Sequence, residues 1–273
     1  MKFTKMHGLG NDYIFLNCMD AILPGDPPAL ARRLSDRHFG VGGDGLICIC
    51  PSETADFRMR IYNADGSEGA MCGNGIRCVG KYVWDKGMTN KRKLTVETLS
   101  GNRELELHLR GGRVAGVTAD MGVPGVGKQH TISVKGRSYT GIEVSMGNPH
   151  FVVPVPDPAS VELPAVGAAM ERDPQFPGGV NVEFVRAAGR DRVEMRVWER
   201  GSGETMACGT GACAALAALA ALGQVDPVVT VSLPGGSLEI LYRERDGHML
   251  MTGPAVTVFD GELCQEVWDG ADQ

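Results

Sequence analysis

Two stretches of the chain alternate apolar and polar residues as a half-buried β-strand does. One is FRMRIYNAD, which begins at Phe57, and the other is VEMRVWER, in which Val193, Met195 and Val197 fall on the same side. This period of two residues predicts a strand in each stretch. Four shorter runs predict additional strands: LTVETL, ELELHL, VTVSL and LEILYR.

The pattern changes after each of two cysteines. Beyond Cys72, apolar residues recur at helical spacing as far as Val83, and from Thr210 to Leu222 the chain is almost entirely Ala and Leu. Alanine and leucine are strong helix formers, and a helix that is apolar on every side has to be buried on every side. We therefore predict that Cys72 and Cys208 each lie at the N-terminus of a central helix with a sheet wrapped around it.

The two cysteine segments resemble each other in sequence. MRIYNADGSEGAMCGNG, from Met59, aligns with MRVWERGSGETMACGTG, from Met195, so that the two cysteines coincide. A second pair, GNDYIFL from Gly10 and GNPHFVV from Gly147, aligns with an offset that differs from the first by a single residue. Offsets that agree so closely indicate an internal duplication, with one G-N segment and one C-G-x-G segment in each copy.

The duplication predicts two pseudo-symmetric, homologous domains in an α+β fold. Each domain is expected to be a mixed, largely antiparallel sheet around its helix, with the active site in the cleft between the domains. A glycine-rich turn, RGGRVAG at residues 110–116, is the expected boundary. The N-terminal domain would then span residues 1–115, joined by the C-terminal tail 255–273, and the C-terminal domain residues 116–254.

Composition narrows the class of protein. Of the 273 residues, 43% are hydrophobic and 22% are charged, which is typical of a globular protein. The formal net charge of −6 argues against a nucleic-acid partner, because such proteins present a basic face. The first ten residues lack the apolar core of a signal peptide, and the most apolar stretch, residues 207–222, is too short to span a membrane. We therefore expect a cytoplasmic protein without a membrane partner.

The eight cysteines contain no C-x-x-C spacing, which weakens both a zinc site and a thioredoxin-like site. We therefore expect no metal. In a reducing compartment these thiols stay reduced. Six of them have no glycine-flanked repeat and are expected to be inert core residues: Cys18, Cys48, Cys50, Cys78, Cys213 and Cys264.

Cys72 and Cys208 carry the chemistry that the sequence suggests. A thiolate is the reactive form of cysteine, and a helix N-terminus lowers the pKa of a cysteine placed there. The Gly-x-Gly after each cysteine lets backbone N–H groups approach an anion such as a carboxylate. Inverting a stereocentre needs a base on one face of a carbon and an acid on the other. Two duplicated cysteine sites supply that pair of groups.

The motifs resemble those of the diaminopimelate epimerase family, over nearly the whole chain. The resemblance implies an isomerase that epimerises L,L-diaminopimelate to meso-diaminopimelate without pyridoxal phosphate or another cofactor, in lysine and cell-wall precursor biosynthesis. It also implies a small-molecule amino-acid substrate and a homodimer. The matching segments are HGLGNDY at 7–13, GDGL at 43–46, NADGSEGAMCGNG from 63, MGNPHFV at 146–152, GVNVEF at 179–184, WERGSGETMACGTGA from 198 and GPAVTVFDGE at 253–262.

The same resemblance implies roles for individual residues. Cys72 and Cys208 would be the acid–base pair, with His150 assisting Cys72 and Glu199 assisting Cys208. Arg200 would clamp a substrate carboxylate. The other implied substrate-binding residues are the amides Asn11, Asn63, Asn148 and Asn181, the backbone cradles Gly73–Asn74 and Gly209–Thr210, and Glu199 itself. One departure from the pattern is Gly45, where some members of the family carry a glutamine.

Three alternatives stay open at this point. A proline racemase or hydroxyproline epimerase resembles the same two-cysteine design, although Arg200 and the asparagines suit a second polar substrate end better. A thiol redox or metal-binding protein would use cysteines differently, and the missing C-x-x-C spacing counts against it. A catalytically inactive binding domain of the same fold would not need both cysteines.

Overall fold

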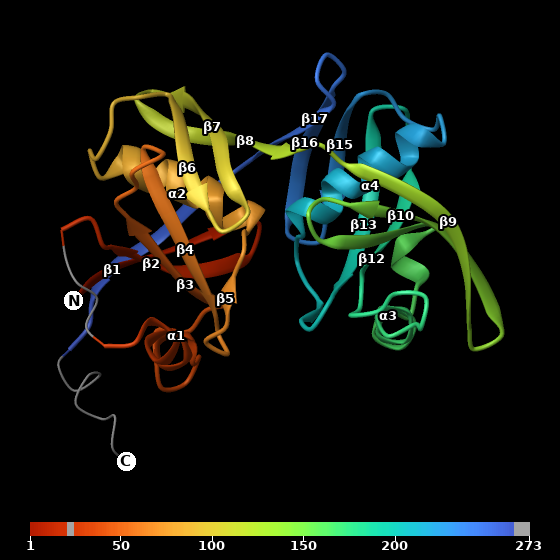
Figure 1. The fold of residues 1–273 in the computed structure, drawn as a ribbon, viewed down its shortest axis with the longest axis horizontal. Coiled ribbons are helices and arrows are strands. Elements are labelled where there is room, and N and C mark those ends of the chain that lie inside the picture. The colour runs from red at the N-terminus through yellow and green to blue at the C-terminus, as the bar shows by residue number, and fades with distance from the viewer. Residues whose placement is uncertain (21–24, 265–273) are drawn as a thin grey trace. The chain divides into compact units, whose positions relative to one another are not determined.

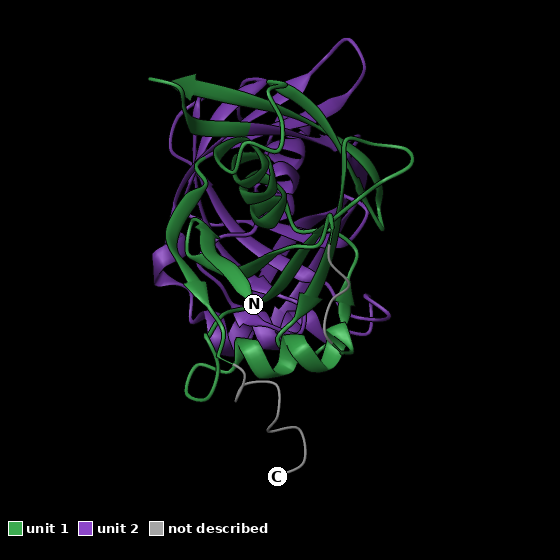
Figure 2. Ribbon diagram, turned by 90° about the vertical axis from the view of Figure 1, so that its left-hand side faces the viewer, with its two compact units in different colours: residues 1–117, 254–273 green, residues 118–253 purple. Residues whose placement is uncertain are grey.

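The computed structural model describes residues 1–20 and 25–264, so the end of the tail expected to join the N-terminal domain lies outside the described residues. The chain divides into two compact units, residues 1–117 with 254–273 and residues 118–253 (Figure 2). We call them unit 1 and unit 2. Each combines helices with a mixed sheet, which confirms the α+β class. None of the described helices is long and apolar enough to cross a membrane.

Unit 1 is a sheet with strand order β18-β1-β2-β3-β4-β6-β7. Neighbouring strands are antiparallel except β2 with β3 and β4 with β6. Its elements are β1 (Lys2–Gly8), β2 (Asn11–Asn17), α1 (Pro27–Ser35), β3 (Gly45–Cys50), β4 (Phe57–Asn63), β5 (Glu68–Gly69), α2 (Gly73–Asp85), β6 (Lys93–Thr98), β7 (Gly101–Arg110) and β18 (Val256–Glu262). Strand β8 (Arg113–Gly122) carries the chain from unit 1 into unit 2.

Unit 2 repeats this arrangement, with strand order β9-β10-β11-β12-β13-β15-β16-β17. Only β11 with β12 and β13 with β15 are parallel. Its elements are β9 (Gly125–Val134), β10 (Arg137–Ser145), β11 (Pro149–Pro154), the 3-10 helix η1 (Pro158–Ser160), α3 (Leu163–Glu171), β12 (Asn181–Ala187), β13 (Arg192–Glu199), β14 (Gly203–Glu204), α4 (Gly209–Ala221), β15 (Val228–Leu233), β16 (Gly236–Arg243) and β17 (His248–Gly253).

The predicted strands are confirmed. The two alternating stretches form β4 and β13, and the four shorter runs lie in β6, β7, β15 and β16. In unit 1 the two-residue strand β5 pairs with the end of β4, and in unit 2 the two-residue strand β14 pairs with the end of β13. Each short strand leads to the cysteine of its unit. The order of pairings from β1 to β7 therefore matches the order from β10 to β16.

The predicted central helices are α2 and α4 (Figure 1). Each begins directly after its cysteine. Helix α4 contacts β9 to β13, β16 and β17, so unit 2 wraps strands around it. Residues 211–219 of α4 are buried, in agreement with their Ala- and Leu-rich sequence. The prediction that α4 is buried on every side is wrong for its last turn, since Ala221 and Leu222 are exposed.

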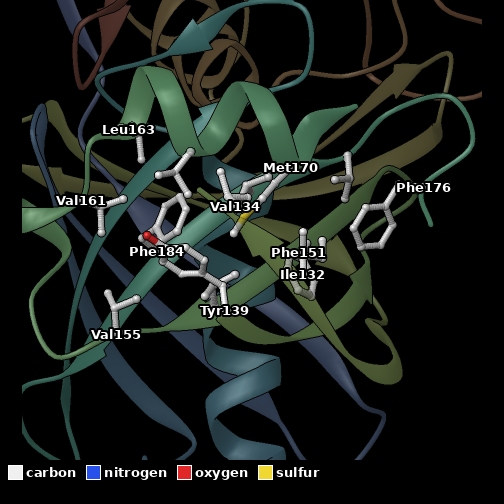
Figure 3. Close-up of a cluster of buried hydrophobic side chains, with 14 residues drawn as sticks. Ile132, Val134, Tyr139, Phe151, Val155, Val161, Leu163, Met170, Phe176 and Phe184 are labelled. Atoms are coloured by element: carbon white, nitrogen blue, oxygen red, sulfur yellow. The ribbon is translucent and has the colours of Figure 1, made fainter. Parts of the chain in front are cut away.

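The opposite face of the unit 2 sheet is covered by α3, and a cluster of aromatic and aliphatic side chains fills the space between them (Figure 3). Phe151 of β11 and Phe184 of β12 are fully buried in this cluster. Burying a side chain of this size contributes about 1.5–3 kcal/mol. Because neighbouring residues of a strand point to opposite faces, this packing directs His150 and Glu183 to the face that α4 covers.

Candidate active site

Each cysteine is the N-cap residue of its central helix, as predicted. Cys72 has φ −133° and ψ 116°, and its Sγ accepts a hydrogen bond from the backbone N–H of Gly75 at 3.3 Å. Cys208 has φ −117° and ψ 114°, and its Sγ accepts from the N–H of Gly211 at 3.4 Å. The thiols therefore replace the hydroxyl or carboxylate that usually caps a helix, and they lie at its positive end.

In unit 1, a chain of hydrogen bonds fixes Asn11 beside Cys72. The thiol of Cys72 donates to Asn11 Oδ1 at 3.2 Å, and Asn11 Nδ2 donates to Asp44 at 2.8 Å. Asp44 in turn forms an ion pair with Arg37 at 3.1 Å. The Asn11 carbonyl is thus directed at the thiol. Asn63, the last residue of β4, donates to the hydroxyl of Ser67 at 2.9 Å.

A buried guanidinium holds the Gly73–Asn74 cradle. Arg77 is fully buried in the second turn of α2 and donates to the carbonyl of Gly73 and to Asn74 Oδ1, both at 3.0 Å. A third bond joins its Nε to the carbonyl of Pro254 at 3.3 Å. Sequence reasoning missed this residue, although a charged residue within an apolar helical run was a signal for it.

In unit 2, a chain of contacts runs from Cys208 through three further predicted residues: Thr210, Asn148 and His150. The Thr210 hydroxyl lies 3.5 Å from the sulfur, and Asn148 Nδ2 donates to that hydroxyl at 3.4 Å. Asn148 Oδ1 is 3.1 Å from Nε2 of His150. Asn181 lies at the start of β12, where its amide bridges the carbonyl of Pro149 and the N–H of Arg200.

Burial and two nearby carboxylates shape the electrostatics around Cys208. Burial raises the pKa of the Cys208 thiol well above its usual range, and nearby Glu199 and Glu183 raise it further. Burial also raises the pKa of Glu199, which accepts a hydrogen bond from Thr205. The expectation that a helix N-terminus lowers the pKa is therefore wrong for Cys208. Loss of water and two acidic neighbours outweigh the helix dipole there.

Two of the predicted roles are not visible in these contacts. Arg200 is exposed, and its guanidinium donates to the carbonyl of Gly178 in a neighbouring loop at 3.1 Å. His150 belongs to unit 2 together with Cys208, whereas its implied role is to assist Cys72 of unit 1. Both roles therefore stay predictions.

The structure explains why position 45 holds glycine. A Cβ there would lie 2.2 Å from the carbonyl oxygen of Tyr62 and 2.9 Å from Cε1 of Tyr13. Tyr13 is buried, and burial raises its pKa well above the usual range. The electrostatic effect of Cys72 is the second largest cause of the raised pKa. An aromatic side chain of β2 therefore fills the space beside Cys72 that a longer residue at position 45 would enter. The sequence did not single out Tyr13.

A third missed residue is Glu183, whose carboxylate meets Nδ1 of His150 at 2.6 Å while both side chains are fully buried. A lone acidic residue in the apolar run VNVEFV was the available signal. Within residues 1–20 and 25–264, no three His, Cys, Asp or Glu side chains are grouped so that they could ligate a metal ion.

Solved structures of known fold resemble the whole chain at low sequence identity. A probable proline racemase from Agrobacterium radiobacter K84 matches with a TM-score of 0.76 and 18% identity, covering 98% of this chain and 94% of that one. A hydroxyproline epimerase from Agrobacterium vitis matches with a TM-score of 0.74 and 19% identity, covering 99% and 97%. At these identities the similarity establishes the fold alone.

Sequence comparison is more specific. The family model described as diaminopimelate epimerase matches residues 3–126 and 142–258. The diaminopimelate epimerase of Moorella thermoacetica is 50% identical, with 96% of this chain and 99% of that protein aligned. The diaminopimelate epimerase of Acetivibrio thermocellus is 49% identical, with 96% and 98% aligned. This chain therefore belongs to the diaminopimelate epimerase family.

Proposed function

We propose that this chain interconverts L,L-diaminopimelate and meso-diaminopimelate by a cofactor-independent mechanism in which Cys72 and Cys208 are the two acid–base groups. One observation carries the proposal: the chain places two equivalent thiols, each as the N-cap residue of the central helix of its unit. About half of the residues are identical to those of diaminopimelate epimerases over 96% of the chain, which supports the substrate assignment.

The proposed reaction needs one thiolate and one thiol. With Cys208 protonated, Cys72 is the base: its thiolate removes the α-hydrogen, and the C–H electron pair stays on the α-carbon. The thiol of Cys208 then delivers a proton to the opposite face of that carbon and becomes the thiolate. The reverse reaction exchanges the two roles, so both cysteines are needed in each direction. In this scheme His150 assists Cys72, and Glu199 assists Cys208.

Backbone N–H groups at the two helix N-termini would bind the carboxylate of the reacting centre, at Gly73–Asn74 and Gly209–Thr210. Negative charge that develops on the carbanion is stabilised there by oriented dipoles. The amides of Asn11, Asn63, Asn148 and Asn181, with the carboxyl of Glu199, would bind the polar groups of the substrate. Arg200 would clamp the carboxylate of the distal amino-acid end.

The assignment to diaminopimelate implies a cytoplasmic step in lysine and cell-wall precursor biosynthesis. We further propose a homodimer formed through β18. This strand pairs with β1, and its Val256, Val258 and Phe259 are exposed, so they form an apolar edge that a second copy could cover. Sedimentation should give a dimer for the wild-type protein and a monomer for Val258→Lys. A wild-type monomer at working concentrations contradicts this part of the proposal.

The decisive assay is incubation of the purified chain with L,L-diaminopimelate in the presence of a chelator, followed by chiral analysis. We expect meso product from the wild-type protein and none from Cys72→Ala or Cys208→Ala. Cys213→Ala is the matched control, because Cys213 is buried in the same helix away from its N-terminus. L-Proline and hydroxyproline serve as alternative substrates. Turnover of a ring amino acid with no reaction of diaminopimelate would overturn the substrate assignment.

A further inference from the structure

The pair formed by Glu183 and His150 is unusual for its burial. The two side chains come from the parallel strands β12 and β11, are both 0% exposed, and meet at 2.6 Å between Oε1 and Nδ1. Placing a carboxylate out of contact with water is costly unless its partners repay the lost hydration. Here the imidazole is the hydrogen-bonding partner of only one carboxylate oxygen.

The second carboxylate oxygen of Glu183 is buried and has no hydrogen-bond partner among the described residues. The carboxylate also lies against the start of α4, because a Cβ at Gly211 would be 2.7 Å from Oε1. Gly211 is the residue whose N–H donates to Cys208. The carboxylate therefore lies beside the helix N-terminus that carries the thiol. An incompletely satisfied buried acid is destabilising, which suggests a role other than packing.

Unit 1 provides an internal comparison. Ile47 precedes Cys72 by as many positions as Glu183 precedes Cys208, and a Cβ at Gly75 would lie 2.6 Å from Ile47 Cδ1. In the aligned G-N segments, Tyr13 stands where unit 2 has His150. The same strand pair therefore folds with an apolar side chain in place of Glu183, so a buried carboxylate is not required by the architecture.

We propose that Glu183 is a positioning residue for the epimerisation: its carboxylate fixes the imidazole of His150 through Nδ1, and its charge acts on the thiol of Cys208 beside the start of α4. The proposal rests on the proposed two-cysteine function and deepens it. The titratable groups that face Glu183 within unit 2 are His150 on β11, Glu199 on β13 and Cys208 before α4. Burial and Glu199 raise the pKa of Cys208 more than Glu183 does, so Glu183 supplements their effect.

Two substitutions separate the two parts of this role. Glu183→Gln keeps the shape and an acceptor for Nδ1 but removes the charge. Glu183→Asp keeps the charge, but its side chain is one methylene shorter, so the carboxylate lies farther from the imidazole. Glu194→Gln on β13 is the matched control, because Glu194 pairs with Arg186 at the surface. The measurements are alkylation of each cysteine against pH, followed by peptide mapping, together with kcat, KM and the thermal midpoint.

We expect the alkylation profile of Cys208 in Glu183→Gln to move to lower pH while that of Cys72 stays in place. In Glu183→Asp we expect the Cys208 profile to stay near wild type and kcat to fall by about tenfold or more, with KM changed much less. Glu194→Gln should leave all four readouts unchanged. A purely structural carboxylate predicts lower thermal midpoints with unchanged kcat and an unchanged Cys208 profile in both variants, and that result would overturn the proposal.

Alkylation and turnover report on Glu183 and on the substrate separately. The alkylation profiles need no substrate, so they report on Glu183 even if diaminopimelate is not turned over. If the wild-type protein is active and both Glu183 variants match it, the inference fails and the function stands. If one variant does not fold, the other still tests its own part of the role. Glu183→Gln tests the charge through the Cys208 alkylation profile, and Glu183→Asp tests the positioning through kcat.

Discussion

Asn63 and Glu199 hold the same position in the two units: each is the last residue of its strand, β4 or β13, and each lies nine residues before its cysteine, 63 to 72 and 199 to 208. Their chemistry differs. The Asn63 amide donates to Ser67, whereas the Glu199 carboxyl accepts from Thr205 and raises the pKa of Cys208. The strand before the cysteine therefore ends in a neutral amide in unit 1 and in an acid in unit 2.

This difference predicts the behaviour of Glu199→Gln. Burial and Glu199 are the two largest causes of the raised pKa of Cys208, so removing the acid should lower that pKa. Alkylation of Cys208 by iodoacetamide should then begin at lower pH than in the wild type, and kcat should fall by about a hundredfold or more because Cys208 loses its acid–base partner. Glu239→Gln, on the exposed side of β16, is the control. An unchanged Cys208 profile would remove Glu199 from its proposed role.

The raised pKa of Cys208 also predicts a pH dependence of stability. A thiol that titrates above its ordinary value of 9.0 holds its proton more tightly in the folded protein than in the unfolded chain. The free energy of unfolding therefore falls as the pH rises past the unfolded value, and the contribution is fully present only below it. Between about pH 8 and pH 10, the wild type should lose about 1 kcal/mol more than Cys208→Ala in urea unfolding. Equal losses in both proteins would contradict the assignment.

Arg200 provides a test of the distal substrate contact. Arg200→Lys keeps the positive charge but loses the planar group that binds a carboxylate through two parallel hydrogen bonds. We expect KM for diaminopimelate to rise and kcat to fall, because a displaced substrate also misplaces the α-carbon. Arg245→Lys, in an exposed loop pair with Asp246, is the control. The clamp is rejected if kcat/KM for Arg200→Lys equals that of the control.

Position 45 tests the packing beside Cys72. In Gly45→Ala the new methyl group would clash with the carbonyl of Tyr62, which belongs to the neighbouring strand and cannot rotate away. We expect a loss of about 1–3 kcal/mol in the free energy of unfolding. At Gly125 an added Cβ would meet nothing closer than 3.6 Å, so Gly125→Ala is the control. Equal stability of the two variants would show that the sheet at Gly45 adjusts freely.

The sequence predicted what depends on local periodicity. Alternation identified β4 and β13, and the Ala- and Leu-rich composition identified α4, because these patterns act within a few residues. The change to a helical pattern after each cysteine placed both cysteines at helix N-termini. The parallel pairs β2–β3 and β11–β12 were not predicted, since each joins strands separated by a long connection whose helix lies on one face of the sheet.

The residues that were missed at the candidate site depend on non-local contacts. Glu183 meets His150 across 33 positions of sequence, and only the parallel register of β11 with β12 brings them together. Arg77 donates to the carbonyl of Pro254, which lies 177 positions further along the chain. The pKa of Cys208 was predicted in the wrong direction because sequence shows the helix N-terminus but not the loss of water around the thiol.

Running the reaction in D2O and stopping it early tests whether two cysteines, one in each unit, invert one carbon. The thiol that delivers the proton has already exchanged with solvent, whereas the other thiolate takes the substrate hydrogen. We expect early meso product to carry deuterium at the inverted α-carbon while unreacted L,L-diaminopimelate remains protiated. Early product that retains its α-hydrogen, or recovered substrate labelled as fully as the product, would contradict the roles assigned to Cys72 and Cys208.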